Sequence, residues 1–167
     1  MPLSIISSDD ETLNRLCVQL GRHLLHQCHT ITTAESCTGG GVAHAITNIV
    51  GSSQWFSHGF ITYSNVAKQQ LLQVSESELE RYGAVSSQVA EAMACGAIAA
   101  AHADVAIAVT GIAGPGGGSE EKPVGTVWIA WAKKDFSVIS QAFIFEGDRK
   151  GIRYQTVIEA IKGALTL

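Results

Sequence analysis

The sequence has few charged residues and no run of basic ones. Only 16% of its 167 residues are charged and 46% are hydrophobic, so a substantial core is expected and long disordered tails are not. The formal net charge is −4, and lysine and arginine cluster nowhere along the sequence. This pattern argues against a general nucleic-acid or membrane-surface binder, and we expect neither among the partners.

Export and membrane signals are also lacking. The first ten residues contain no basic region and no long apolar segment, unlike a signal peptide. The alanine-rich run from Ala90 to Val109 is interrupted by Glu91, His102 and Asp104, which indicates a buried helix and a strand rather than a membrane span. The four cysteines show no CxxC spacing and are expected to be reduced thiols, mostly in the interior. A cytoplasmic location is therefore predicted.

The length and the lack of repeats or linkers predict one domain over residues 1–167. Apolar periodicity and capping residues predict a helix from Ser8 (a capping box with Glu11), a strand at 31–34, helices at 39–49 and 65–72 around a strand at 60–63, helices at 75–83 and 89–100, strands at 105–110, 124–132 and 136–145, and a last helix capped by Asp148. The last two strands form a predicted hairpin. This order predicts an α/β fold, a three-layer α/β/α sandwich with a mixed central sheet.

The segment from Thr32 to Gly41 is the most informative part of the chain. Ser36 follows a β-prone stretch and precedes a glycine-rich turn, after which the next predicted helix begins. Backbone N–H groups at such a turn favour developing negative charge, as an oxyanion requires. Serine at a helix start is commonly just an N-cap. The three glycines after Thr38 favour a closer approach of ligand or backbone, with Thr38 as the cap and Ser36 free to point into a site.

Tyr63 and Lys68 follow a predicted strand and are candidate activators of Ser36. A desolvated lysine loses its proton and becomes a usable base, and a lysine base is an established variation among serine hydrolases. The tyrosine then relays the proton or holds the lysine in place, and the spacing leaves open which residue is the immediate base. A surface tyrosine–lysine pair is the simpler alternative.

Further candidates lie around a second strand end. Thr110 ends an apolar strand, where ligands gather in α/β sheets, and Gly111 begins a glycine-rich segment. That segment fails both the phosphate-loop and the dinucleotide-binding templates but suits the wall of an active site. Arg149 is a candidate phosphate ligand, with a solvated charge as the alternative. The histidines lack metal-ligand spacing, so neither a metal nor a cofactor is expected.

Several ordered motifs resemble the CinA C-terminal domain family of nicotinamide-nucleotide amidohydrolases. They are TTAESCTGG, GSSQWFSHGFITYSNVAK, YGAVSSQVAEAMA, TGIAGPGGGSEEKPVGTVWIA and EGDR. The likeness runs from about Leu13 to the C-terminus, and the chain looks like a stand-alone form. The resemblance implies metal-independent hydrolysis of the carboxamide of nicotinamide mononucleotide to nicotinic acid mononucleotide and ammonia, which recycles pyridine nucleotide.

Carried over by motif, the resemblance implies that Ser36 is the nucleophile and that Lys68 with Tyr63 takes its proton. N–H groups around Thr38 to Gly40 would then stabilise the oxyanion, and water would hydrolyse the acyl-enzyme. The expected partner is a small nucleotide substrate, and a homodimer is expected from the family and the apolar composition. The predicted substrate-binding residues are Thr38, Gly39, Gly40, Thr110, Gly111 and Arg149.

Two alternatives remain open at this point. One is a catalytically inactive or differently specific relative that binds a nucleotide without deamidating it, and Gly41 and Gly116 depart from the pattern expected of the family. The other is a short-chain dehydrogenase, since those enzymes also combine serine, tyrosine and lysine. Dehydrogenases need the spacing YxxxK, whereas Tyr63 to Lys68 is one residue longer, and residues 3–21 lack their glycine fingerprint.

Overall fold

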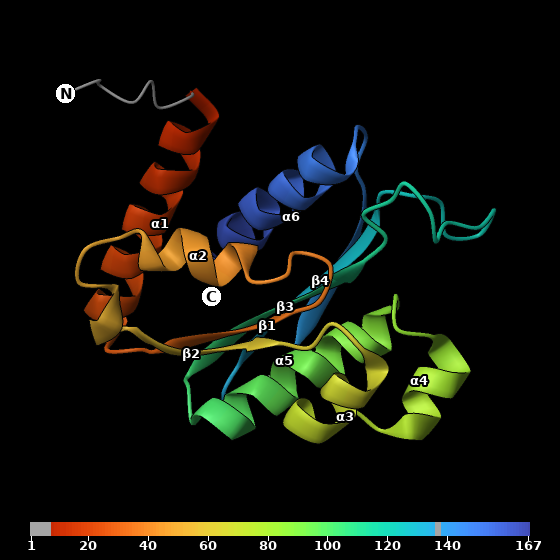
Figure 1. The fold of residues 1–167 in the computed structure, drawn as a ribbon. Helices are drawn as coiled ribbons and strands as arrows, with labels where there is room; N and C mark the ends of the chain where they lie inside the picture. The colour runs from red at the N-terminus through yellow and green to blue at the C-terminus, as the bar shows by residue number, and fades with distance from the viewer. Residues whose placement is uncertain (1–7, 136–137) are drawn as a thin grey trace.

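A mixed five-stranded sheet forms the centre of the protein in the computed structural model, which describes residues 8–135 and 138–167 (Figure 1). Its strands are β1 (Ile31–Glu35), β2 (Phe56–Ile61), β3 (Val105–Gly111), β4 (Thr126–Lys133) and β5 (Ile139–Ile144), in the order β2-β1-β3-β4-β5. β1 runs parallel to β2 and β3, whereas β4 is antiparallel to β3 and β5. The predicted mixed sheet with a closing hairpin is therefore confirmed.

Helices cover both faces of this sheet (Figure 1). One face carries α1 (Ser8–Gln27), α2 (Gly41–Thr47) and α6 (Arg149–Ala164), and the other carries α3 (Asn65–Leu72), α4 (Glu76–Tyr82) and α5 (Ser87–Ala101). A short 3-10 helix, Ser52–Gln54, precedes β2. The architecture is the predicted three-layer α/β/α sandwich.

The central strand β3 divides the core into two parts of different character. Val105, Ile107 and Val109 belong to the cluster of large apolar side chains under α1, α2 and α6. The alternate residues Ala106 and Ala108 belong to the alanine-rich cluster beneath α5. Small residues on both surfaces let α5 lie close to the sheet, as its small-residue stripe predicted.

The close packing of α5 also fixes the position of α3. A Cβ atom on Gly96 of α5 would lie 2.0 Å from the backbone oxygen of Leu72, the last residue of α3. Only glycine therefore permits the observed contact between these helices. The helix α3 that is held in this way carries Lys68, a candidate base from the sequence.

Several predicted boundaries differ from the structure. β2 begins at Phe56, four residues before the predicted strand, because it is an edge strand whose exposed residues hide the apolar pattern. α2 begins at Gly41 rather than Gly39, since Gly39 and Gly40 have φ angles of 57° and 97°, outside the right-handed helical region. The predicted start of the last strand falls on residues 136–137, which lie outside the described residues.

Helix capping agrees with the sequence where it is described. Ser75 and Glu78 form the predicted capping box of α4, and Asp148 caps α6 by accepting a hydrogen bond from Gly151 N–H at 2.8 Å. The predicted capping box at Ser8 involves a side chain outside the described part of the structure.

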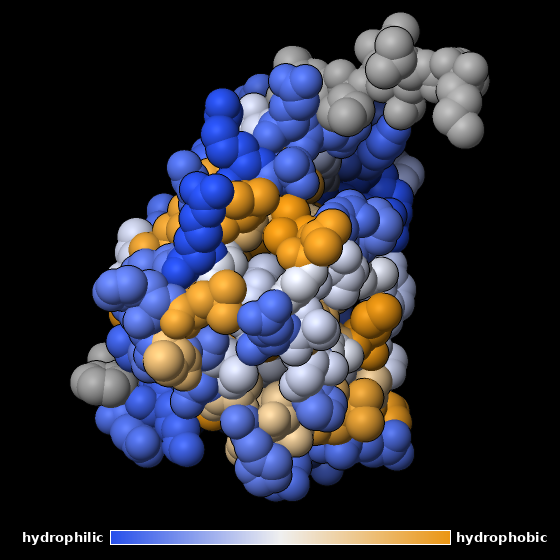
Figure 2. All heavy atoms as spheres, turned by 90° about the vertical axis from the view of Figure 1, so that its left-hand side faces the viewer, coloured by the Kyte–Doolittle hydropathy of each residue, from blue (hydrophilic) through white to orange (hydrophobic). Residues whose placement is uncertain are grey.

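The surface of the protein mixes apolar and polar side chains. Figure 2 shows one face on which hydrophobic patches are broken up by hydrophilic residues. Among the described helices, none combines the length and the apolar character required to cross a bilayer. Nothing on this face singles out a dimer interface, and the homodimer stays a prediction.

Replacing Gly96 by alanine should destabilise the protein, because the added methyl group meets backbone that cannot move aside. We expect a loss of about 1–3 kcal/mol in the free energy of unfolding, measured by urea denaturation. Gly116→Ala is the matched control, since a Cβ there meets nothing within 4 Å. Equal stability of the two variants would contradict the close packing of α3 on α5.

Candidate active site

Ser36 lies at the carboxyl edge of the parallel strands. It directly follows β1, and its N–H donates to the carbonyl of Val109 at 3.0 Å, which extends the pairing of β1 with β3 by one residue. The residue is nearly buried, with 9% of its surface exposed. The serine is thus fixed by sheet hydrogen bonding, at the edge where α/β proteins bind ligands.

Lys68 reaches Ser36 from α3. Its Nζ lies 3.1 Å from Ser36 Oγ and donates a second hydrogen bond, of 2.8 Å, to the carbonyl of Thr62. The side chain is 1% exposed, and within the described part of the chain no ion pair involves it. Burial lowers the pKa of Lys68 from its ordinary value of 10.5, partly opposed by the nearby Cys37 thiol. The structure therefore favours the neutral amine, which is the form that can accept a proton.

Tyr63 makes a different contact from the predicted one. Its hydroxyl accepts a hydrogen bond from Arg149 Nη2 at 2.9 Å, and neither Ser36 nor Lys68 bonds to it. Arg149 also donates through Nη1 to the carbonyl of Gly114 at 2.8 Å. The ring of Tyr63 is 60% exposed. This arrangement contains no proton relay through Tyr63 and makes Lys68 the group in contact with the nucleophile.

A cavity of about 270 Å³ brings most of the predicted residues together. Its lining includes Ser36, Tyr63, Lys68, Thr110, Gly111 and Arg149. The turn residues predicted to bind substrate, Thr38 to Gly40, are not part of that lining. The cavity thus brings Ser36 and Lys68 together, with the Tyr63–Arg149 pair beside them.

Thr110 and Gly111 shape one wall of this cavity. The Thr110 hydroxyl donates to the carbonyl of Ala84 at 2.8 Å and thereby ties β3 to the segment before α5. A Cβ on Gly111 would lie 2.8 Å from the carbonyl oxygen of Thr126, so glycine is needed for the pairing of β3 with β4. Both residues hold the wall in place through contacts within the protein.

Glu35 organises the turn after Ser36, and sequence reasoning missed it. This carboxylate, 1% exposed, accepts the hydroxyl proton of Thr38 at 2.6 Å and the N–H groups of Gly40, Val42 and Ala43 at 3.1, 3.0 and 2.8 Å. The predicted capping role of Thr38 is therefore wrong, because Thr38 is a donor to the residue that caps α2. An acidic residue just before a predicted helix was the available signal.

Of the N–H groups predicted to stabilise an oxyanion, those of Gly39 and Gly40 have acceptors within the protein, whereas that of Thr38 has no backbone acceptor among the described residues. Gly39 N–H donates to the carbonyl of Ser36 at 3.0 Å, and Gly40 N–H is held by Glu35. Those of Cys37 and Thr38 donate to no other backbone group in the described parts of the chain. In the strand–turn–helix arrangement of many hydrolases, the residue after the nucleophile supplies an oxyanion N–H. The candidate oxyanion donors are thus Cys37 and Thr38.

Cys37 is a buried thiol in this turn, with 5% of its surface exposed. Burial raises its pKa to about 12. The thiol therefore stays protonated at neutral pH and does not compete with the neighbouring Ser36 as a nucleophile.

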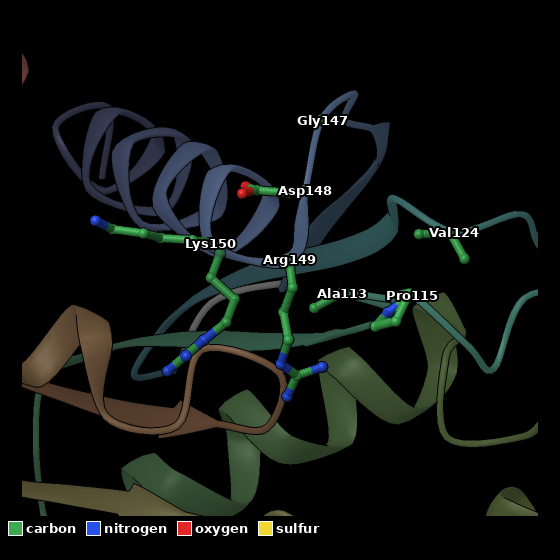
Figure 3. A pocket seen from close by; sticks show the side chains of 8 residues that line it. Ala113, Pro115, Val124, Gly147, Asp148, Arg149 and Lys150 are labelled. Atoms are coloured by element: carbon green, nitrogen blue, oxygen red, sulfur yellow. The ribbon is translucent and has the colours of Figure 1, made fainter.

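A second cavity, of about 460 Å³, adjoins the first and shares Ala113 and Arg149 with it. Arg149, Lys150 and Arg153 line it, and Figure 3 shows Arg149 extending from the start of α6 toward Ala113 and Pro115. No basic cluster stands out in the sequence, because Arg149 and Arg153 come to the same side only through one turn of helix α6. Three cations thus gather beside the Ser36 cavity.

The described residues contain no group of three histidine, cysteine, aspartate or glutamate side chains placed to hold a metal ion. Of the histidines that cluster in the sequence, His23 lies 3.4 Å from the carbonyl of Leu167 through Nε2. This contact ties the end of α1 to the C-terminal residue.

Comparison with known proteins assigns the family. Residues 13–167 match the family model described as the CinA C-terminal domain. A nicotinamide-nucleotide amidohydrolase PncC of Enterobacter agglomerans is 54% identical over 156 residues, covering 93% of this chain and 95% of that protein. The PncC of Escherichia coli K12 is 52% identical, covering 92% and 93%. This chain belongs to the CinA C-terminal domain family.

Solved structures agree with this assignment. The competence/damage inducible protein CihA from Agrobacterium tumefaciens has a TM-score of 0.91 and 40% identity, covering 99% of this chain and 100% of that one. A CinA superfamily protein from Escherichia coli has a TM-score of 0.90 and 39% identity, covering 100% and 95%. The fold observed here is therefore the fold of the CinA superfamily.

Replacing Lys68 by methionine should raise the melting temperature at neutral pH, because the folded state no longer has to keep a buried amine neutral. The pKa of Lys68 is lower in the folded than in the unfolded chain, so the parent gains stability as pH rises toward 10.5. We expect the variant to have the higher melting temperature at pH 7 and the difference to shrink by pH 10. Each 1 kcal/mol of added stability corresponds to about 2–4 °C in melting temperature.

Calorimetry of parent and variant at both pH values tests this, since other titrating groups cancel in the difference. A variant that is less stable than the parent at pH 7, or an advantage that grows with pH, would contradict the assignment of a neutral buried lysine.

Proposed function

We propose that this protein is a serine amidohydrolase that deamidates nicotinamide mononucleotide to nicotinic acid mononucleotide and ammonia. The observation that carries the proposal is the contact of 3.1 Å between Ser36 Oγ and a buried Lys68 Nζ without a countercharge. The name of the PncC relatives, at 51–54% identity over nearly the whole chain, supports a nicotinamide nucleotide as the substrate.

Acylation begins when neutral Lys68 accepts the Ser36 hydroxyl proton. Ser36 Oγ forms a bond to the carboxamide carbon, and the carbonyl electron pair moves onto oxygen, where the N–H groups of Cys37 and Thr38 stabilise it. The carbon–nitrogen bond then breaks, and the Lys68 ammonium returns its proton to the leaving nitrogen. Ammonia departs, and the nicotinoyl group is left as an ester on Ser36.

Deacylation repeats the same proton transfers with water as the nucleophile. Lys68 takes a proton from water while the water oxygen adds to the ester carbon, and it then protonates Ser36 Oγ as the ester bond breaks. The products are the carboxylic acid and free serine. Lys68 makes every proton transfer in this scheme, while its hydrogen bond to the Thr62 carbonyl keeps Nζ at one position.

The second cavity fits the phosphate of a mononucleotide. Arg149, Lys150 and Arg153 line it, and Arg149 borders both cavities. Guanidinium groups bind phosphate oxygens in bidentate fashion. A substrate with its carboxamide at Ser36 and its phosphate beside α6 would therefore occupy both cavities, in keeping with the predicted role of Arg149.

The positions that depart from the family pattern do not touch the reacting groups. A Cβ on Gly41 would lie 3.1 Å from Val157 Cγ2, so glycine there suits the packing of α2 against α6. A Cβ on Gly116 would meet nothing within 4 Å. We therefore favour an active enzyme over an inactive relative. Membership of the CinA C-terminal domain family also displaces the short-chain dehydrogenase alternative.

Ser36→Ala should abolish turnover without changing the fold. We expect a loss of about 10⁴-fold or more in kcat, because no other nucleophile is in place, and a melting temperature near that of the parent. Release of ammonia and of nicotinic acid mononucleotide, followed in parent and variant, measures the effect. Turnover by Ser36→Ala comparable to that of the parent would rule out Ser36 as the nucleophile. Failure of this variant to fold would indicate that Ser36 has a structural role instead.

The pH dependence of kcat/KM should report the ionisation of Lys68. Activity should rise with pH as Lys68 loses its proton, with a midpoint below 10.5 because burial lowers the pKa of this side chain. Lys68→Arg is the control, since a guanidinium keeps its charge and cannot serve as the base. A rise centred at or above 10.5, or an active Lys68→Arg variant, would count against Lys68 as the base.

A further inference from the structure

The turn from Ser36 to Gly40 is made of residues that would not hold one shape by themselves. Three consecutive glycines follow Thr38, and Gly39 and Gly40 both adopt positive φ angles. Glycine has the largest conformational freedom in an unconstrained chain, so such a turn samples many shapes unless other groups hold it. Two charged side chains from distant parts of the sequence provide that hold.

Glu35 holds the turn from its start. Its Oε2 accepts both the Thr38 hydroxyl at 2.6 Å and the Gly40 N–H at 3.1 Å, while Val42 and Ala43 donate to the same carboxylate from the first turn of α2. One rigid acceptor thus links the end of β1, the turn and the helix. The negative charge is fully enclosed but has four donors.

Arg153 holds the turn from the other side, across 115 residues of sequence. Its Nη2 donates to the Thr38 carbonyl at 2.8 Å, and the same nitrogen lies 3.4 Å from where a Cβ on Gly39 would be. Thr38 is therefore fixed at two points, through its hydroxyl by Glu35 and through its carbonyl by Arg153. These contacts hold the side chain of Thr38 and the peptide group that follows it, and so restrain the backbone at its Cα.

We propose that Glu35 and Arg153 are positioning residues that aim the N–H groups of Cys37 and Thr38 at the oxyanion formed during attack by Ser36. The proposal rests on the proposed function. Its physical basis is preorganisation, since a donor stabilises developing charge only when its direction is set before the reaction begins. Neither side chain lines the cavity that contains Ser36, so both would act on the reacting atoms through the turn, although Arg153 also lines the adjoining cavity proposed for the phosphate.

Capping alone does not account for the contacts of Glu35. A serine or asparagine satisfies the first N–H groups of a helix without burying a charge. The carboxylate additionally receives the hydroxyl of Thr38, and that bond serves the turn rather than α2. A positioning role therefore predicts that catalysis is more sensitive than stability to loss of this bond.

Thr38→Val and Thr38→Ser form the sharpest test, because the first removes the hydroxyl at nearly constant volume and the second keeps it. We expect Thr38→Val and Glu35→Gln to lower kcat by about 10²–10³-fold with KM within about threefold of the parent, while Thr38→Ser retains most activity. Arg153→Met should likewise lower kcat at saturating nicotinamide mononucleotide, but it should also raise KM, because Arg153 lines the cavity proposed for the phosphate as well.

Ser75→Ala is the stability control. It removes the cap of α4, whose contacts lie away from the turn, and so lowers the melting temperature without touching the active site. We expect this variant to keep the parent kcat. A parent-like kcat in Glu35→Gln and Thr38→Val, or a loss in Ser75→Ala as large as theirs, overturns the proposal.

A second readout separates this proposal from the choice of substrate. A fluorophosphonate reacts with an activated serine, and its P=O oxygen requires the same N–H donors. Labelling of Ser36 that is fast in the parent and at least tenfold slower in Glu35→Gln supports the positioning role. That conclusion holds even if nicotinamide mononucleotide is not hydrolysed, because the lack of hydrolysis would contradict only the assignment of the substrate. Equal labelling of the two overturns the positioning role, and no labelling of Ser36 in the parent overturns both.

Discussion

The contact between Ser36 and an enclosed lysine is the constraint on which the rest of the site depends. An ammonium group without a countercharge is costly to bury, so the folded protein lowers the pKa of Lys68 and favours the neutral amine, the form that the proposed base requires. A carboxylate beside Nζ would stabilise the protonated form and remove that property. The neutral carbonyl of Thr62 orients the amine without adding charge. Burial of Lys68 thus lowers the stability of the folded protein and at the same time suits the lysine to the proposed role of base.

The two residues of the proposed catalytic pair come from different layers, and glycine sets the distance between them. Ser36 extends β1 in the sheet, while Lys68 is carried by α3 in one helical layer. Because α3 lies against Gly96 of α5, an added methyl group there would push on the end of the helix that carries the lysine. Packing in the alanine-rich half of the core therefore helps to set the geometry of the proposed catalytic pair.

Much of this could be predicted from the sequence, and the remainder depends on contacts between distant residues. The layers followed from local periodicity, and the resemblance of motifs pointed to Ser36 and Lys68. The edge strand β2 was misplaced because its exposed residues do not alternate clearly. No local pattern brings Arg153 to the Thr38 carbonyl, and the sequence could not show that Tyr63 pairs with Arg149 instead of the lysine.

The placement of charge suits the proposed combination of a lysine of lowered pKa with an anionic substrate. Cations that bind a phosphate would raise the cost of a charged lysine if they lay beside it. Here Arg149, Lys150 and Arg153 gather in the adjoining cavity, while burial alone lowers the pKa of Lys68. Arg149 is further occupied by Tyr63 and by the Gly114 carbonyl, which direct its guanidinium along the boundary of the two cavities. A substrate spanning both would meet positive charge at one end and an uncharged base at the other, and this is the arrangement that a phosphorylated amide requires.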